Sequence, residues 1–172
     1  MDTQKKGLLV FLAVTGVSIA GPMVKWSMSC GASPVMVAFG RMALSFLLLL
    51  IPALKSGELQ AVVHAPRKQV ALACASGFLL AMHYTCWMTS LSFASTFVST
   101  ALVCTQPLFV AALSGVLLHE PIKREAVPGA VVAVVGAAAI GLLSMGGEQG
   151  SLLGDALALI GSMFLAGHWL TS

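Results

Sequence analysis

Two adjacent residues, Gln106 and Pro107, lie at the centre of a long apolar stretch, residues 94–118, where they could bind a solute. Pro107 has no backbone N–H, so a helix through this stretch leaves the carbonyl of Val103 without its usual donor. Gln106 adds a side-chain amide beside that acceptor. Either these groups bind a polar ligand at a broken helix, or Gln106 bonds to a neighbouring helix and the proline only kinks its own helix.

A charged residue, Arg41, lies seven residues inside another apolar stretch, 34–54. If that stretch is a membrane-spanning helix, Arg41 lies about 10 Å below one surface at about 1.5 Å per residue. A charge near the membrane centre costs about 2.5–3.5 kcal/mol, and less near the surface. Arg41 is therefore expected to face protein or water. It either contacts a ligand or forms a gate, or it caps carbonyls and snorkels to the surface.

Aromatic residues and hydroxyls lie at helical spacing in the stretches that follow. His83 and Trp87 are four residues apart and share one helix face, and Tyr84 lies in the adjacent row. They form either the wall of a small-molecule pocket or part of an aromatic belt at the membrane surface. Thr100 belongs to a row of small polar residues spaced by four. It either lines a wet face with Gln106 or bonds back to its own helix.

The elements that must position these residues are membrane-spanning helices. Hydrophobic residues form 58% of the 172-residue chain and charged residues 9%, against about 45–50% and about 25% in soluble proteins. This composition excludes a soluble globular protein, a disordered chain and a nucleic-acid-binding protein. Because a helical span needs about 20 apolar residues, we predict an all-α integral membrane protein with spans at 7–28, 34–54, 69–90, 94–118, 124–145 and 151–172.

Basic residues fix the expected orientation. With a cytoplasmic N-terminus, the loops predicted outside the cell (29–33, 91–95 and 146–150) contain no Lys or Arg. Cytoplasmic ends of membrane helices are enriched in these residues. The basic residues that fall at cytoplasmic ends are Lys5, Lys6, Lys55, Arg67, Lys68, Lys123 and Arg124. We therefore predict a multi-pass protein of the plasma (inner) membrane with its N-terminus in the cytoplasm.

Small residues recur every four positions in the predicted fifth span, at Gly129, Ala133, Ala137 and Gly141. This spacing forms a flat strip along one side of a helix, as close packing of membrane helices requires. We refer to these four residues as the span-5 strip and expect it to pack against a helix, either of this chain or of a second chain.

A weak internal repetition divides the chain. Ala20-Gly21 in the first span corresponds to Ala166-Gly167 in the sixth, 146 residues later. Five spans per repeat would give the second copy the opposite orientation, as in the inverted repeats of many secondary transporters. We expect residues 1–146 to form one five-helix repeat and residues 151–172 to begin an incomplete second repeat.

Several short motifs occur in the order that is typical of one transporter family. They are Val24-Lys25-Trp26, Phe39-Gly40-Arg41-Met42-Ala43, Gln106-Pro107-Leu108-Phe109 and Leu117-Leu118-His119-Glu120-Pro121. In this order the chain resembles the EamA-like half of the drug/metabolite transporter superfamily, although His119 and Pro121 replace a Gly and an Arg of its pattern. The resemblance implies ten helices in two inverted halves, of which this chain would be the first half and the start of the second.

The function that follows is secondary transport of small organic metabolites or drugs. The alternative is a membrane-embedded fragment or assembly partner that transports nothing. The motifs of intramembrane proteases are incomplete, so we expect no enzyme. The cysteines form no C-x-x-C pair and the histidines no H-E-x-x-H motif, so we expect no metal site, and we expect no cofactor. Lys25 and Arg41 make one half of the bundle positive, which favours neutral, zwitterionic or anionic solutes. The expected partners are the solute, the lipid bilayer, and a second copy or a missing C-terminal half, but no nucleic acid.

Overall fold

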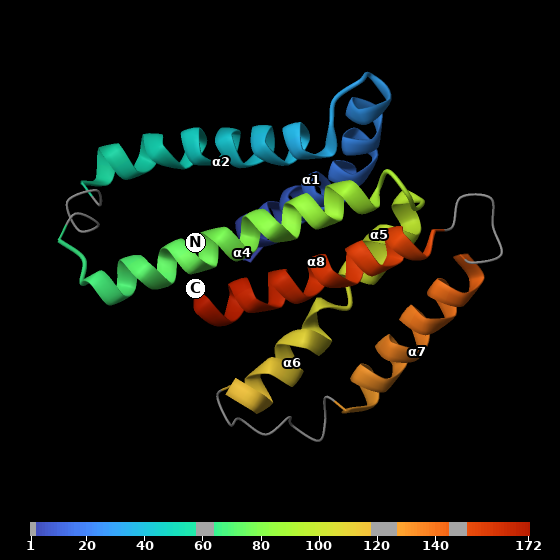
Figure 1. Cartoon of the computed structure of the whole chain (residues 1–172). Helices are drawn as coiled ribbons and strands as arrows, with labels where there is room; N and C mark the ends of the chain where they lie inside the picture. Colours follow the sequence, from blue (N-terminus) through green and yellow to red (C-terminus); the bar gives the residue numbers. More distant parts are fainter. Residues whose placement is uncertain (1–2, 58–63, 118–126, 145–150) are drawn as a thin grey trace.

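A computed structural model describes residues 3–57, 64–117, 127–144 and 151–172. In these ranges the chain forms helices and no strand, which confirms the all-α prediction. The helices are α1 (Thr3–Ser29), α2 (Pro34–Ser56), α4 (Arg67–Ser90), α5 (Thr96–Val103), α6 (Gln106–Leu117), α7 (Val127–Ser144) and α8 (Leu152–Thr171) (Figure 1).

Within the described residues, five segments are long and apolar enough to cross a membrane. They are Val10–Ser29, Pro34–Ser56, Arg67–Ser90, Thr96–Val116 and Leu152–Thr171, and they correspond to five of the six predicted spans. The predicted span 124–145 contains α7, whose 18 residues (Val127–Ser144) extend over roughly 27 Å at about 1.5 Å per residue. Its segment Val127–Ala139 is found as a shorter apolar helix. Residues 124–126 and 145 lie outside the described ranges.

Local sequence signals set several helix ends. The Ser33 hydroxyl accepts a hydrogen bond from the N–H of Met36 at 3.2 Å, and Pro34 occupies the first position of α2. Both features are typical of a helix start, where backbone N–H groups lack partners. Gly57 ends α2 with φ +74°, a left-handed conformation that glycine adopts without steric cost. The hydroxyl of Ser95 caps α5 in the same way as Ser33, by accepting from Val98 N–H at 3.2 Å.

The central helix of the bundle is α4, which lies between α2 and α8 (Figure 1). Both neighbours run antiparallel to it, so that the start of α8 meets the end of α4 (Figure 1). The hydrophobic core cluster joins α1, α2 and the end of α4, and consists of Val24, Ala38, Trp87, Met88 and Leu91. The polar residues on α4 therefore face two helices that come from opposite ends of the chain.

The contact between α4 and α8 is made by small residues. Gly154, Ala158, Ser162 and Ala166 are spaced by four along α8, and all four are buried. A Cβ atom at Gly154 would lie 2.9 Å from Cβ of Ala94 and 3.0 Å from its backbone nitrogen. Small residues allow this approach of two backbones, which is how membrane helices gain dispersion contacts in the absence of a hydrophobic driving force.

The surface of the bundle is apolar. Large side chains on α2 are exposed, among them Phe39 (74%), Phe46 (63%) and Leu49 (68%). A soluble protein rarely exposes contiguous apolar area of this kind, whereas lipid tails solvate it well. The exposed faces of α1 and α2 therefore fit a bilayer.

Candidate functional site

Arg41 lies over the aromatic side chains of α4. Its guanidinium carbon is 4.7 Å from the ring centroid of Tyr84 and 5.8 Å from that of Trp87. Both distances are within the range of cation–π attraction, which contributes about 0.5–1 kcal/mol at exposed sites and about 2 kcal/mol or more when desolvated. The rings of His83 and Trp87 are stacked, with centroids 6.1 Å apart and an interplanar angle of 14°. The structure thus brings together four of the residues singled out in the sequence.

These aromatic residues lie inside the bundle. His83 and Trp87 are buried, and Tyr84 and Arg41 are half-buried. A pocket of about 540 Å³ lies beside Arg41, between α1 and α2, with Met23, Val24 and Val37 among its lining residues. A guanidinium has its N–H donors in its plane, so rings that cover its face leave these donors available to a ligand.

His83 also has a structural contact. Its Nδ1 lies 2.8 Å from the backbone oxygen of Gly161 on α8. Because a carbonyl oxygen only accepts, Nδ1 carries the proton and donates it. This hydrogen bond fixes the orientation of the imidazole ring and ties α4 to α8.

The predicted break in the fourth span is present. α5 ends at Val103 and α6 begins at Gln106. Backbone hydrogen bonds at the junction are of the tighter i to i−3 kind, from Thr105 N–H to Leu102 O at 3.1 Å and from Leu108 N–H to Thr105 O at 2.9 Å. The carbonyl that Pro107 releases is that of Val103. The Ser162 hydroxyl on α8 donates to it at 3.3 Å.

Gln106 is half-buried at the start of α6, whereas Pro107 and Thr100 are exposed. This element meets the aromatic cluster through Val103, which packs against the hydrophobic core cluster that contains Trp87. Arg41, His83, Tyr84 and Trp87 therefore form one group, and Gln106 with Pro107 forms a second group connected to it through the end of α5.

The span-5 strip is more open than the α8 interface. Gly129 is exposed, and a Cβ atom there would meet nothing within 4 Å. Ala133 and Ala137 are half-buried, and the surroundings of Gly141 lie outside what the structure describes. Close helix packing at this strip therefore stays a prediction, and at Gly129 the partner helix is not one from the described part of this chain.

Sequence reasoning missed three polar contacts between helices, which join α4 to α8, the α5–α6 junction to α8, and α4 to α5. Ser76 Oγ lies 2.7 Å from His168 Nδ1, and Thr105 Oγ1 lies 3.5 Å from Ser162 Oγ. Ser90 is buried and hydrogen-bonded to Ser99. The signal for them was small and polar residues at a spacing of four in 152–171, but the same spacing in 129–141 gave no reason to prefer one helix.

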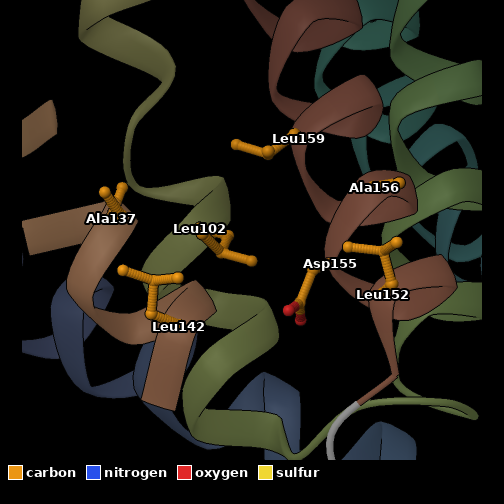
Figure 2. A pocket seen from close by; sticks show the side chains of 8 residues that line it. Leu102, Ala137, Leu142, Leu152, Asp155, Ala156 and Leu159 are labelled. Atoms are coloured by element: carbon orange, nitrogen blue, oxygen red, sulfur yellow. The ribbon is translucent and has the colours of Figure 1, made fainter. Parts of the chain in front are cut away.

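Asp155 was also missed as a site residue. It is 6% exposed, and it lines a pocket of about 480 Å³ between α5, α7 and α8. Figure 2 shows its carboxylate pointing into this space. As for metals, no group of three or more His, Cys, Asp or Glu side chains in the described ranges is placed to hold an ion.

The helices and their buried polar contacts define an all-α, multi-pass membrane protein. The model of the EamA-like transporter family matches residues 4–142, which is most of the chain. The chain therefore belongs to the EamA-like transporter family, a family of membrane transporters in the drug/metabolite superfamily, and the resemblance drawn from the motifs is confirmed. No curated protein and no solved structure matches the chain.

Proposed function

We propose that the protein is a secondary transporter of small organic solutes in the plasma membrane, without enzymatic activity. The observation that carries the proposal is the position of Arg41, whose guanidinium lies over Tyr84 and Trp87 beside a pocket in a membrane-spanning bundle. A cation held inside a membrane protein is costly. A ligand that pairs with the in-plane N–H donors would justify that cost.

The solute site that we propose has two parts. The guanidinium of Arg41 binds a carboxylate or another polar acceptor, and the rings of Tyr84, Trp87 and His83 contact an apolar part of the solute. Gln106 contributes an amide at the break between α5 and α6, with Thr100 and Pro107 on the same segment. The positive charge favours anionic, zwitterionic or neutral solutes over cations at this site.

We further propose that the transporting unit contains two five-helix repeats of opposite orientation, the first within residues 1–146. Two observations support this division. The family model ends at residue 142, before α8 begins at Leu152. The paired Ala-Gly motifs at 20–21 and 166–167 support the proposal that α8 is the first helix of the second repeat. The basic residues support a cytoplasmic N-terminus.

Flux measurements in proteoliposomes test the function. Radiolabelled leucine, malate and uracil serve as zwitterionic, anionic and neutral probes, for this chain and for any longer parent that contains it. Saturable flux of at least one probe is expected. Absence of flux for all three in both proteins, at verified folding, would favour the alternative of an assembly partner without transport activity. The open surface at Gly129 is the observation that supports this alternative.

Substitutions test the site. Gln106→Ala should weaken the affinity for the transported probe by a few-fold to about tenfold, because a lost hydrogen bond typically costs about 0.5–1.5 kcal/mol. Gln106→Leu should be as harmful or worse. The matched control is Gln69→Leu, at an exposed position in the first turn of α4. Wild-type transport by Gln106→Leu at normal abundance would contradict a solute site in α6.

Arg41 is expected to act through both charge and geometry. Arg41→Lys keeps the charge but loses the planar set of donors, so partial transport is expected. Arg41→Gln removes the charge, and no transport is expected. Equal transport by the two variants would exclude a role for the charge.

A further inference from the structure

The indole N–H of Trp87 is a buried hydrogen-bond donor without an acceptor. The side chain is 7% exposed, and its Nε1 has no hydrogen-bond partner in the described part of the chain. An indole nitrogen only donates, and native proteins satisfy the large majority of their buried polar atoms. An acceptor supplied by a bound ligand would complete this donor.

Arg41 connects the indole to the pocket between α1 and α2. Its guanidinium carbon lies 5.8 Å from the ring centroid of Trp87, and its side chain also lines the pocket of about 540 Å³. Val24 and Val37 line the same pocket. Val24 belongs to the hydrophobic core cluster that contains Trp87, and Val37 packs against that cluster. The pocket and the indole therefore share one layer of side chains, formed by Val24, Val37 and Arg41.

The charge in this pocket matches a single negative charge. Arg41 is the one charged residue among the ten lining residues that the structure describes. Lys25 does not line the pocket, and its ammonium donates to the backbone oxygen of Ala94 at 3.3 Å. A phosphate monoester carries a charge of about −1.5 to −2 at pH 7, which one guanidinium does not balance. A carboxylate carries one charge and accepts two parallel N–H bonds from a guanidinium.

The remaining wall of the pocket is apolar. Apart from Arg41, its one polar side chain in the described ranges is Ser27, whose hydroxyl donates to the backbone oxygen of Met23 at 2.9 Å. No acidic residue is among the lining residues, so an ammonium group on the ligand would enter this space without a partner, and burying an unpaired charge is costly. These features disfavour a zwitterion and favour a carboxylate whose remaining atoms are apolar.

We infer that the site binds a monocarboxylate with an apolar body. Its carboxylate accepts from the in-plane N–H groups of Arg41, and one of its oxygens also accepts from Nε1–H of Trp87 when the valines of the shared layer move aside. The apolar body contacts methionine and leucine side chains of the pocket wall. This inference rests on the proposed solute site and narrows its ligand to one chemical class.

Three compounds with one carbon skeleton test the class. They are 4-methylpentanoate, which is a monocarboxylate, leucine, which adds an ammonium group, and 4-methylpentanamide, which is uncharged. Equilibrium binding of radiolabelled 4-methylpentanoate is measured on the purified chain in phosphatidylcholine nanodiscs, with empty nanodiscs as background, and the other two compounds compete with it. Saturable binding is expected, with leucine and the amide each about tenfold weaker or more.

Two pairs of variants test the two donors. Trp87→Phe keeps an aromatic ring and removes the N–H, so the affinity for 4-methylpentanoate should fall by a few-fold to about tenfold. Its matched control is Trp169→Phe, at a position that is 61% exposed, which should bind like the wild type. Arg41→Met should abolish binding. Its matched control, Lys55→Met, removes a charge from an exposed position of α2 outside the pocket and should retain binding.

A spectroscopic measurement keeps Trp87 in place and does not depend on the folding of Trp87→Phe. In a chain that carries Trp26→Phe and Trp169→Phe, Trp87 is the one remaining tryptophan. The ultraviolet resonance Raman band that reports hydrogen bonding at the indole nitrogen should shift to its bonded frequency when 4-methylpentanoate is added. A merely structural role of Trp87 leaves this band unchanged.

Four outcomes would overturn the inference. They are the absence of saturable 4-methylpentanoate binding to the wild type, equal affinity for the amide, tighter binding of leucine, and an indole band that does not respond to bound 4-methylpentanoate. The proposed transport function is judged separately, by flux of leucine, malate or uracil. Flux of any of these without 4-methylpentanoate binding overturns the inference and leaves the transport proposal standing.

Discussion

Adding one methyl group at Gly154 should destabilise the bundle, although alanine is the better helix former. The substitution Gly154→Ala places a Cβ 2.9 Å from Cβ of Ala94, 3.0 Å from its backbone nitrogen and 3.1 Å from the carbonyl carbon of Phe93. Two of these three atoms belong to the backbone and cannot rotate away. Overpacking of this kind costs about 1–3 kcal/mol, and α8 must move away from α4 to relieve it.

Two other glycines provide a graded comparison. A Cβ at Gly161 would lie 3.4 Å from three atoms of α4, and a Cβ at Gly77 would meet nothing within 4 Å. Exchange of glycine for alanine inside an exposed helix stabilises it by about 1 kcal/mol. We therefore expect Gly77→Ala to be as stable as the wild type or more so, Gly161→Ala to lie close to the wild type, and Gly154→Ala to be the least stable.

The assay is thermal unfolding in detergent, followed by the fluorescence of the tryptophan side chains. For a chain of this size about 1 kcal/mol shifts the Tm by roughly 2–4 °C, so Gly154→Ala should melt roughly 2–12 °C below Gly77→Ala. The double variant Gly154→Ala with Ala94→Gly removes the closest atom and should recover part of the loss. Equal melting temperatures for Gly154→Ala and Gly77→Ala would refute the close approach of α8 to α4.

Three other predictions concern the hydrogen bond at the helix break, the topology and the span-5 strip. Ser162→Ala removes the donor to the carbonyl that Pro107 releases, and should lower the free energy of unfolding by about 1–3 kcal/mol. Ser162→Thr keeps the hydroxyl and should lower it less. Equal melting temperatures for the two variants would contradict this prediction. In intact cells, an impermeant thiol reagent should label a chain whose only cysteine is Cys30, and should not label one whose only cysteine replaces Gln60; the reverse pattern would invert the proposed orientation. Ala137→Leu should destabilise the fold or an assembly more than Val134→Leu does, and equal effects would remove the strip from helix packing.

The helix break in the fourth span could be predicted because its cause is local. A proline lacks an N–H whatever surrounds it, so the sequence alone identifies the carbonyl of Val103 as the acceptor without a helical donor. The donor could not be identified in the same way. Ser162 is 59 residues away, and only the packing of α8 on α4 brings its hydroxyl to that position.

Small residues at a spacing of four illustrate the same limit. Gly129, Ala133 and Ala137 in α7 and Gly154, Ala158 and Ser162 in α8 have the same pattern. Only the α8 series is fully buried. Both helices are predominantly apolar, so a hydrophobic face does not reveal which side meets protein and which meets lipid.

The sequence identified individual residues of the candidate site, but it did not predict that they lie together. Arg41, Tyr84 and Trp87 were chosen separately, from charge depth and aromatic spacing, and the antiparallel contact of α2 with α4 places them together. Asp155 was not among the residues chosen from the sequence. It lines a pocket formed by three helices, and such a pocket has no signature in any one of them.

The bond from Ser162 to Val103 has a consequence for biosynthesis. The two residues are 59 positions apart, and ribosomes add about 5–20 residues per second. The carbonyl of Val103, at the break between α5 and α6, therefore lacks the Ser162 hydroxyl for roughly 3–12 s after its own synthesis. During this interval Ser76 and His83 on α4 also lack the α8 groups to which they are bonded in the finished fold. The nascent protein thus lies in the membrane with polar groups that lack their final hydrogen-bond partners. These groups stay available to the insertion machinery until α8 is inserted.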